Sequence, residues 1–451
     1  MKNNFSQPVS RRDFIGLAAA GVGTALTVTA PRCAKQSAIE YNPASSGPID
    51  PVRVAFVGVG NQGSGHVRNL LRIEGAELIA VCDIVEEKVA RMQSWARAAG
   101  KPEPRGYSRS ETDFRRMCAE EDLDLVMTAT PWKWHVPICV EAMKTGSHTA
   151  TEVPAALTID ECWELVETAE KTNKHCVMLE NVCYMGPEMM ILNMVRHGLF
   201  GELLHGEGAY NHDLRNMKTG SAYEKQWRIY HSMKRNGNLY PTHGLGPIAQ
   251  CMNINRGDRF DYLVSMSSPA RGLKLYAAEK LGADHPFAKA DYACGDVNTC
   301  LIKTVKGRTI TLVHDTNLPR PYSRINLIQG TRGITQGWPD RIHIEGRSPR
   351  HRWEPLENYR EEFEHPLIRM AEDAARGAGH GGADFIEDWR LIEALRHGRP
   401  VDMDVYDAVD WSVISELTEI SVARRSRPVN FPDFTRGRWK ERKPLQFEGV
   451  E

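Results

Sequence analysis

The sequence predicts an α/β fold made of two units. The first is a doubly wound parallel β-sheet, and the second is an α+β unit with an open, mostly antiparallel sheet. Apolar runs alternate with amphipathic helical patterns from residue 52 to about residue 185, which is typical of right-handed βαβ units. After about residue 200 the apolar runs follow one another without long helices, which favours antiparallel pairing. A chain of 451 residues can bury two cores.

The first unit is expected to contain five buried strands with helices between them. The strands are predicted from apolar, β-branched runs, and the helices from apolar residues that recur every three or four positions. The predicted strands are 52–58, 77–82, 124–129, 147–152 and 175–180, and the predicted helices are 62–73, 86–99, 135–145 and 159–172. Thr158 is expected to cap the last of these helices, because Glu161 completes a capping box.

The second unit is expected to begin with strands and to end with helices. The predicted strands are 203–211, 262–267, 297–304, 309–315 and 324–329, with a hairpin at Lys306-Gly307, and the predicted helices are 366–376, 384–397 and 407–425. The last segment, from Pro428 to Glu451, is rich in proline, arginine and phenylalanine and is expected to wrap over the surface. We therefore divide the chain into residues 1–33, a linker at 34–50, a first domain at 51–185 and a second domain at 186–451.

The turn after the first predicted strand has the glycine spacing of a dinucleotide-binding loop. Gly58 allows a tight turn, Gly60 leaves room for a pyrophosphate, and Gly63 lets the next helix pack closely on the sheet. Asp83, twenty residues after Gly63, can accept hydrogen bonds from ribose hydroxyls, and no arginine follows it, which favours NAD over NADP. We expect a Rossmann domain that binds NAD through Gly58, Gly60, Asn61, Gln62, Gly63 and Asp83.

The charge and the amino-acid composition argue against some classes of binding partner. The formal net charge of −1 argues against nucleic acid, and no apolar run after residue 50 is long enough to span a membrane. The ten cysteines form no CxxC pair, so we expect buried, reduced thiols and no metal site.

The first 33 residues have the pattern of an export signal. Ser10-Arg11-Arg12-Asp13-Phe14 precedes a weakly apolar stretch from Gly16 to Ala30, as in twin-arginine signals. That route carries folded proteins, which suits a chain that takes up its cofactor before export. We therefore expect a periplasmic or secreted protein, with a disordered basic tail as the alternative. The cleavage point and lipidation at Cys33 stay open.

Polar and aromatic residues gather after three strands of the first domain. Trp132, Lys133, Trp134 and His135 follow strand 124–129, Glu152 and Val153 lie at the end of strand 147–152, and Asn181 and Tyr184 follow strand 175–180. Because ligands of open α/β sheets bind at the carboxyl ends of the strands, we expect these groups to surround the nicotinamide. For each cluster alone, an ordinary turn before a helix is the alternative.

These features resemble the Gfo/Idh/MocA oxidoreductase family over residues 52 to about 440. The resemblance lies in the glycine loop, in Glu152-Val153-Pro154 at a strand end and in Tyr240-Pro241-Thr242-His243. It implies an NAD(P)-binding Rossmann domain and a second domain, 186–451, that carries a sugar substrate. The dehydrogenases of that family have Glu-Lys-Pro, whose lysine assists oxidation of a hydroxyl. Here Val153 stands in the lysine position, and its side chain cannot move a proton, which argues against a simple dehydrogenase.

One branch of that family fits the motifs better. The twin-arginine pattern together with Thr130 to His135, Thr151 to Pro154, Glu180 to Tyr184 and Tyr240 to Pro247 is similar to glycoside hydrolase family 109, whose members are NAD-dependent α-N-acetylgalactosaminidases. The resemblance implies hydrolysis of terminal α-N-acetylgalactosamine from a glycan or small molecule. The implied steps are NAD-dependent oxidation at C3, elimination across C1 and C2, addition of water and re-reduction at C3, with NAD tightly bound and recycled. Members of the family often associate, but the sequence leaves the oligomeric state open.

The resemblance also implies roles for single residues. Trp132, Lys133, Trp134, His135, Glu152, Val153 and Asn181 would line the nicotinamide, and Tyr210, Arg228, Tyr240, Pro241, Thr242, His243 and Tyr322 would contact the sugar. His243 is the candidate for proton transfer at the C3 hydroxyl, because histidine titrates near neutral pH. Tyr184 is the candidate base at C2, with a packed aromatic side chain as the alternative. Glu152 would orient the nicotinamide ribose or relay protons, and Arg228 would hold the acetamido oxygen or a hydroxyl unless it is a surface arginine.

Two other functions are compatible with the sequence. An NAD-dependent sugar or inositol dehydrogenase of the same family would need added NAD⁺ and would accumulate NADH. A secreted sugar-binding protein with a vestigial cofactor would bind NAD and sugar without turnover. The aglycone of the natural substrate is not determined by the sequence.

Overall fold

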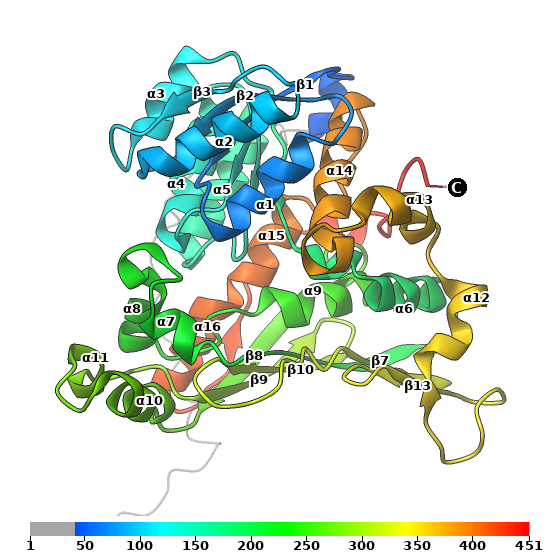
Figure 1. The fold of residues 1–451 in the computed structure, drawn as a ribbon. Helices are drawn as coiled ribbons and strands as arrows, with labels where there is room; N and C mark the ends of the chain where they lie inside the picture. Colours follow the sequence, from blue (N-terminus) through cyan, green and yellow to red (C-terminus); the bar gives the residue numbers. More distant parts are fainter. Residues whose placement is uncertain (1–40, 451) are drawn as a thin grey trace, which may run out of the picture. The chain divides into compact units, whose positions relative to one another are not determined.

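Six parallel strands form the sheet of the first domain (Figure 1). Their order is β3-β2-β1-β4-β5-β6, with bounds β1 Val52–Val57, β2 Ala76–Cys82, β3 Arg105–Tyr107, β4 Leu125–Thr128, β5 His148–Thr151 and β6 Cys176–Met178. The order reverses between β1 and β4, and open α/β sheets bind their ligands at the strand ends beside such a reversal. The predicted doubly wound sheet is confirmed. The sequence did not predict β3, because its three residues include a glycine and form no apolar run.

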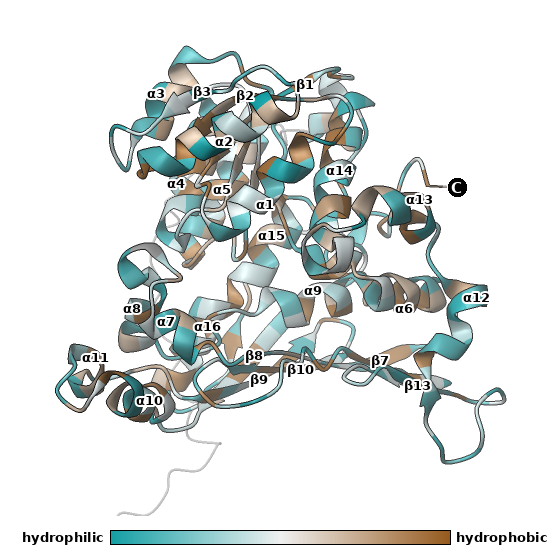
Figure 2. Cartoon of the chain, in the orientation of Figure 1, coloured by the Kyte–Doolittle hydropathy of each residue, from teal (hydrophilic) through white to brown (hydrophobic). Residues whose placement is uncertain are grey.

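Helices pack against the faces of this sheet. Their bounds are α1 Asn61–Leu70, α2 Glu86–Ala98, α3 Asp113–Glu120, α4 His135–Lys144 and α5 Ile159–Thr172. Figure 2 shows hydrophilic residues on outer helices such as α2 and α3 and hydrophobic residues toward the strands. The predicted cap of α5 is confirmed, because the Thr158 hydroxyl accepts the Glu161 N–H and the Glu161 carboxylate accepts the Thr158 N–H, both at 3.1 Å.

Nine strands form a second, mixed sheet in the order β14-β13-β12-β11-β7-β10-β9-β8-β15. The bounds are β7 Leu203–Asn211, β8 Phe260–Ser267, β9 Val297–Thr304, β10 Thr309–Asp315, β11 Leu327–Gly330, β12 Gly333–Gln336, β13 Arg341–Ile344, β14 Glu354–Pro355 and β15 Val429–Asn430. Its neighbouring strands run antiparallel except β7 and β10, which pair parallel. The hairpin between β9 and β10 is confirmed, with Gly307 at φ +88° and its N–H bonded to the Thr304 carbonyl.

Helices cover one face of the second sheet, where α9 packs on β7 and α16 packs on β8. The helices of this part are α6 Gly186–Arg196, α7 Arg215–Thr219, α8 Trp227–Lys234, α9 Thr242–Cys251, α10 Gly272–Leu281, α11 Pro286–Lys289, α12 Arg360–Phe363, α13 Pro366–Ala375, α14 Ala383–Arg396, α15 Val405–Ser412 and α16 Ile414–Ala423. The opposite face exposes Tyr262, Met266 and Leu301.

The predicted helix 407–425 is two helices, α15 and α16. The Ser412 hydroxyl donates to the Ala408 carbonyl at 2.6 Å, a bond to the preceding turn that bends helices. The same hydroxyl accepts the N–H of Ala155, next to the end of β5, at 2.9 Å. The break between α15 and α16 therefore lies at a residue that contacts a distant part of the chain. The spacing of apolar residues in the sequence does not reveal such a contact.

The last part of the chain returns to the first domain. Figure 1 shows α14 (orange) beside α1 (blue), and α15 packs against α5. This return joins residues separated by 322 positions, such as His66 on α1 and Asp388 on α14. The carboxyl edge of the first sheet is therefore completed by residues from the far end of the chain.

The structure, a computed structural model, describes residues 41–450. The expected twin-arginine pattern and Cys33 lie outside the described residues. Within residues 41–450, no helix combines the length and the apolar composition of a membrane span, and the nine cysteines there are free and buried. The tail buries Phe431, Phe434 and Phe447 in the main core, so it packs into the molecule rather than only over its surface.

Replacing Thr158 with alanine should lower the free energy of unfolding by about 1 kcal/mol, because α5 loses its capping box. Urea unfolding followed by circular dichroism measures this loss. Thr112→Ala is the matched control, since Thr112 stands at the N-cap of α3 without a capping bond from its side chain. Equal destabilisation by both substitutions would contradict the role of the Thr158 cap.

Candidate active site

The loop between β1 and α1 leaves room for a phosphate group. Gly58 has φ +83°, a backbone conformation that glycine adopts at little cost. A Cβ on Gly63 would lie 2.0 Å from the Gly58 carbonyl oxygen, so the close start of α1 requires glycine. A Cβ on Gly60 would meet no atom within 4 Å, so the loop is open on that side. The N-terminus of α1 favours anions at this opening.

Asp83, after β2, holds this loop in place. Its two carboxylate oxygens accept the N–H groups of Val59 and Val85, both at 2.9 Å. A carboxylate has about four acceptor positions, so capacity remains for ribose hydroxyls. The open glycine loop and Asp83 therefore fit the pyrophosphate and adenosine ribose of NAD.

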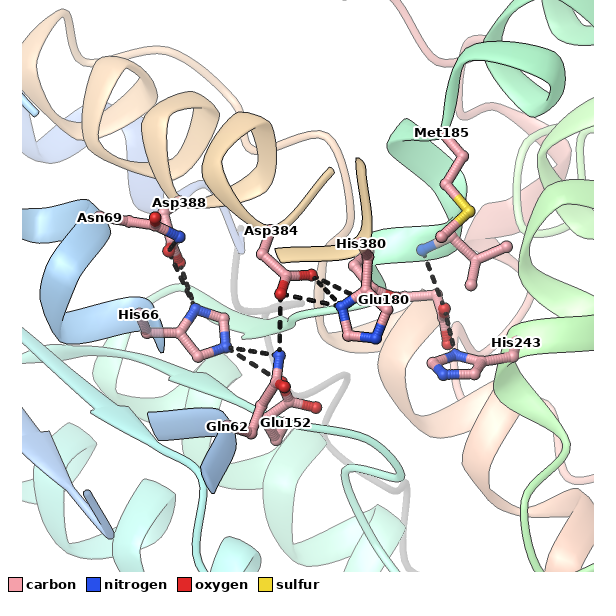
Figure 3. Close-up of polar contacts among 12 residues, drawn as sticks. Gln62, His66, Asn69, Glu152, Glu180, Met185, His243, His380, Asp384 and Asp388 are labelled. Carbon is pink, nitrogen blue, oxygen red and sulfur yellow. Dashed lines mark hydrogen bonds and ion pairs between the residues drawn. The ribbon is translucent and has the colours of Figure 1, made fainter. Parts of the chain in front are cut away.

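Glu152, after β5, is anchored by a buried histidine (Figure 3). Its Oε1 lies 3.0 Å from Nε2 of His66, and its Oε2 accepts the Val153 N–H at 3.1 Å. The other ring nitrogen of His66 lies 2.8 Å from Asp388. Burial alone would lower the pKa of His66, but Asp388 and Glu152 outweigh it and raise that pKa well above its ordinary value. His66 therefore joins Glu152 to Asp388, and these two carboxyl groups favour its protonated form.

A third carboxyl group, from Glu387, lies beside this pair. Within the described part of the chain, His66, Glu152 and Glu387 form the one group whose ligand atoms lie close enough to hold a metal ion, within 4.8 Å of one another. Burial raises the pKa of Glu387 well above its ordinary value, which favours an uncharged carboxyl. Neither oxygen of Glu387 has a hydrogen-bond partner among the described residues, and the absence of a metal stays a prediction.

Asp384, on α14, joins the cofactor loop to the end of β6. Its Oδ1 accepts a hydrogen bond from Asn181 at 2.7 Å, and its Oδ2 accepts one from Gln62 at 3.3 Å. Both oxygens also lie 2.9 Å from Nδ1 of His380. Asn181 and Gln62, both expected at the cofactor, are thus held by a residue that sequence reasoning did not single out.

His243 and Glu180 form an acid–base pair at the same edge. His243 lies in the first turn of α9, and its Nδ1 is 2.6 Å from Oε1 of Glu180. Glu180 is fully buried, and its other oxygen has no hydrogen-bond partner among the residues described. A carboxylate on Nδ1 fixes the tautomer and leaves Nε2 for proton transfer. Sequence reasoning selected His243 and placed Glu180 in a motif at the end of the predicted strand 175–180, but it gave Glu180 no role.

Aromatic rings form a wall beside His243. The ring centroids of Tyr240 and Tyr210 lie 4.9 and 5.4 Å from that of His243, and the guanidinium of Arg228 lies 4.8 Å from the Tyr240 ring and 5.1 Å from the Trp132 ring. Arg228 is only 9% exposed, which excludes the surface-arginine alternative. One of its N–H groups donates to Tyr223 at 2.9 Å, so further donors remain for a ligand.

Other residues expected at the sugar surround this wall. Tyr322 packs edge-on against Tyr210 at 6.2 Å, and its hydroxyl accepts a hydrogen bond from Arg324 at 3.1 Å. Pro241 is the N-cap of α9. Thr242 is buried next to it, with a hydroxyl that has no partner among the described residues. The predicted sugar-contacting residues are thus brought together around Tyr210 and His243.

The residues of the motif Trp132 to His135 lie in different environments. Trp132 packs 5.9 Å from Tyr240 on the aromatic wall, whereas Trp134 packs against Phe114 at 6.0 Å and Lys133 pairs with Glu111. His135 is buried, and its ring nitrogens lie 2.8 and 2.9 Å from the carbonyl oxygens of Pro154 and Thr130. His135 therefore positions the ends of β4 and β5, and Trp132 is the member that faces the sugar-binding residues.

Tyr184 lies in the protein core. Its hydroxyl donates to Asp402 at 3.0 Å, and Asp402 also accepts two hydrogen bonds from Arg390 at 2.8 Å. Burial raises the pKa of Tyr184 well above its ordinary value, so the phenolate that a C2 base requires is disfavoured. These contacts support the packed-aromatic alternative, and the expected role as the base has no support from them.

Two family models match the chain. Residues 52–180 match an oxidoreductase family with an NAD-binding Rossmann fold, and residues 184–441 match the C-terminal domain of glycosyl hydrolase 109. A glycosyl hydrolase family 109 protein of Shewanella pealeana is 50% identical, with 98% of this chain and 100% of that protein covered. A protein of Shewanella oneidensis named alpha-N-acetylgalactosaminidase is 48% identical, with 98% and 99% covered.

A solved structure of levoglucosan dehydrogenase, in complex with NADH and L-sorbose, has a similar fold. The TM-score is 0.67 at 19% identity, and the match covers 85% of this chain and 100% of that one. At this identity the likeness extends to the fold alone.

Asp83→Ala should weaken NAD binding by about tenfold to a hundredfold, because the loop and the ribose both lose a charged acceptor. Calorimetric titration with NAD⁺, together with the NAD content of the purified protein, measures this. Asp122→Ala is the control, since Asp122 is exposed and distant from the loop in sequence. Unchanged NAD affinity in Asp83→Ala would remove Asp83 from the cofactor site.

Proposed function

Since the chain belongs to glycosyl hydrolase family 109, we propose that it is an NAD-dependent α-N-acetylgalactosaminidase. Its glycoside hydrolase class follows from the family, and an NAD-binding Rossmann domain forms its first part. We propose three things beyond that class: that the sugar is N-acetylgalactosamine, that its linkage is α, and that NAD takes part in each turnover. The relative named alpha-N-acetylgalactosaminidase, at 48% identity, supports the choice of sugar.

The observation that carries the proposal is the pairing of carboxylates with histidines at the site. Glycosidases that act without a cofactor generally use two carboxyl groups on either side of the scissile bond. Figure 3 shows three histidines that each pair with a carboxylate, in the pairs Glu152–His66, Glu180–His243 and Asp384–His380. The other ring nitrogen of His66 pairs with Asp388. This arrangement suits the transfer of protons by imidazoles and supports a hydrolysis assisted by oxidation.

Proton transfer at the C3 hydroxyl is the task of His243. When bound, NAD⁺ supplies reversible oxidation at that carbon, with no net redox change over a cycle. Nε2 of His243 takes the hydroxyl proton and later returns it. Glu180, 2.6 Å from Nδ1, stabilises the imidazolium that forms in between. The side chain of Val153 offers no group for this step. The Glu180–His243 pair therefore takes the place of the lysine that the dehydrogenases of the Gfo/Idh/MocA family have at this position.

The aromatic wall and Arg228 hold the sugar. Arg228 is buried against three aromatic rings without a carboxylate partner among the described residues, so its remaining N–H groups are available to an acetamido oxygen. Tyr240 and Tyr322 contribute ring faces and hydroxyls around the same space. These groups orient the sugar relative to Nε2 of His243.

The proposal includes export by the twin-arginine route to the periplasm or beyond, with NAD taken up before export. It is supported by Arg11 and Arg12 and by the apolar stretch that follows them. Those residues lie outside the part of the chain that the structure describes.

Purified protein without added NAD should release 4-nitrophenol from 4-nitrophenyl α-N-acetylgalactosaminide, because the bound cofactor is regenerated in each cycle. The reaction is run in D₂O and followed by absorbance and by NMR of the liberated sugar. We expect deuterium at C2 and no accumulation of NADH. Growth of NADH on free sugars and added NAD⁺, without 4-nitrophenol release, would instead identify a dehydrogenase.

His243→Ala should lower kcat by about 10²- to 10⁴-fold, because the imidazole that transfers the proton is removed. Glu180→Gln should lower kcat by a smaller factor, because the imidazole stays and only its charged partner is removed. Both variants should retain NAD. His205→Ala is the matched control, since His205 pairs with Glu207 at 3.4 Å on β7, outside the site. Undiminished turnover in His243→Ala would exclude His243 from the chemistry.

A further inference from the structure

A small cavity lies next to the aromatic wall, between α7 and α8, which are side by side in Figure 1, and the end of β10. It is lined by Lys218 of α7, Arg228 of α8 and His314 of β10, together with Trp132 of the wall. The cavity has room for one water molecule or one monatomic ion. An acetamido group or a sugar ring is larger than this, so the cavity accommodates neither.

The ammonium group of Lys218 lies beside this cavity and is buried, at 3% exposure. Its three N–H donors are taken by uncharged oxygens. These are the hydroxyls of Ser232 and Thr316, at 3.2 and 2.7 Å, and the amide oxygen of Asn317, at 2.7 Å. No carboxylate among the described residues forms an ion pair with this lysine. A buried charge without an opposite charge is costly, so the site favours an anion.

The two carboxylates nearest to Lys218 are bound to other groups. Asp315 pairs with Arg320 at 3.2 Å, and Asp296 accepts two backbone N–H groups, at 2.6 and 2.9 Å. Burial lowers the pKa of Lys218 to about 7, and Arg228 acts in the same direction, whereas these carboxylates act against it. Their influence is thus too weak to compensate for the burial of the ammonium group.

Arg228 brings a second buried positive charge to the same cavity. Two other buried arginines have carboxylate partners, Arg256 with Asp407 at 2.6 Å and Arg324 with Glu188 at 2.8 Å. Arg228 has no such partner among the described residues, and its guanidinium lies against aromatic rings instead. Two cations therefore lie beside one cavity, and no residue that lines it is acidic.

The polar groups that line the cavity are suited to donate hydrogen bonds. Because the hydroxyl oxygens of Ser232 and Thr316 accept from Lys218, their own O–H groups remain as donors, and neither donates to another described residue. Nδ1 of His314 is buried and has no partner among the described residues. Burial lowers the pKa of His314 well below its ordinary value, so its ring is neutral and carries one N–H. Donors and positive charge together are the chemistry that binds an anion.

We propose that this cavity binds a chloride ion. The O–H groups of Ser232 and Thr316 and an N–H of Arg228 donate to the ion, and Lys218 supplies the opposite charge. A water molecule would fill the same space but would leave both positive charges unopposed. Since Arg228 contacts both the cavity and the aromatic wall, the ion fixes the guanidinium beside the sugar. The binding of chloride is independent of the proposed function, and its effect on hydrolysis rests on that function.

Bromide and chloride test the site in the full chain. Crystals soaked in sodium bromide should show an anomalous scattering peak in the cavity. In solution, the ³⁵Cl line width of sodium chloride measures binding, with gluconate keeping the ionic strength constant. Thr316→Val keeps the shape of the side chain but removes one donor, so chloride binding should weaken by about tenfold or more. Lys218→Met removes the charge and should abolish binding.

The matched control is Thr335→Val. Thr335 is also a buried threonine, on β12, and its hydroxyl donates to the Arg341 carbonyl at 3.1 Å, outside the cavity. Its affinity for chloride should equal that of the wild type. Chloride should raise the melting temperature of the wild type and of this control above the values in gluconate, because the ion binds the folded state. If Lys218→Met does not fold, Thr316→Val still decides between the outcomes.

The effect on hydrolysis is measured separately with the 4-nitrophenyl glycoside. Replacing chloride with gluconate should raise KM by about fivefold or more, the usual size of a coupling between two sites. We expect little change in kcat, because the ion acts on the residue that holds the sugar and not on the proton transfer.

The outcomes separate the anion site from the proposed function. Absence of a bromide peak in the cavity, or equal chloride affinity in the wild type and Thr316→Val, overturns the anion site. A bromide peak with an unchanged KM supports the site and overturns its effect on the sugar. If the wild-type protein hydrolyses no glycoside, the proposed function fails, and the halide measurements still support or overturn the site.

Discussion

The pairing of histidine with buried carboxylate is the interaction on which this site depends. A carboxylate taken out of water is costly unless it is bonded to a partner, and here each of three such groups holds an imidazole: Glu152 with His66, Glu180 with His243 and Asp384 with His380. The pairs differ in what they leave free. His66 is bonded through both ring nitrogens, whereas His243 and His380 are each bonded to their carboxylate through Nδ1 alone. A single type of contact therefore provides both the rigidity and the proton donors and acceptors.

The return of the chain from the second sheet to the first makes these pairs possible. Asp384 and Asp388 lie one turn apart on α14, which packs beside α1 and so meets both the cofactor loop and the core behind it. The site is thus closed by a helix that belongs to the second half of the sequence. Asp384 contacts Gln62 beside the cofactor loop, Asn181 at the end of β6 and His380 in the loop before α14, so one carboxylate joins three parts of the site.

Burial separates the residues that contact ligands from those that support them. His135 and Tyr184 both occur in sequence motifs at strand ends, yet the first spans two backbone carbonyls and the second donates to Asp402 in the core. Trp132 and Arg228, by contrast, are packed into the aromatic wall beside His243. A motif therefore marks a place in the fold, and the direction of each side chain decides which member of the motif meets the substrate.

The sequence by itself determined the parts of this protein that follow from local patterns. Apolar periodicity located β1, β2, β7, β9 and β10, the glycine spacing located the NAD loop, and the capping box located the start of α5, because each depends on residues close together in the chain. It missed β3, the break at Ser412, the residues Asp384 and His380, and the pairing of Glu180 with His243. β3 is a three-residue strand without an apolar run. The break at Ser412 and the pairing of Glu180 with His243 depend on contacts between elements 257 and 63 positions apart, where burial and distance select the partner. The tertiary structure alone decided that Glu152 meets His66 and that Glu180 meets His243, since packing makes that choice and leaves no periodic trace in the sequence.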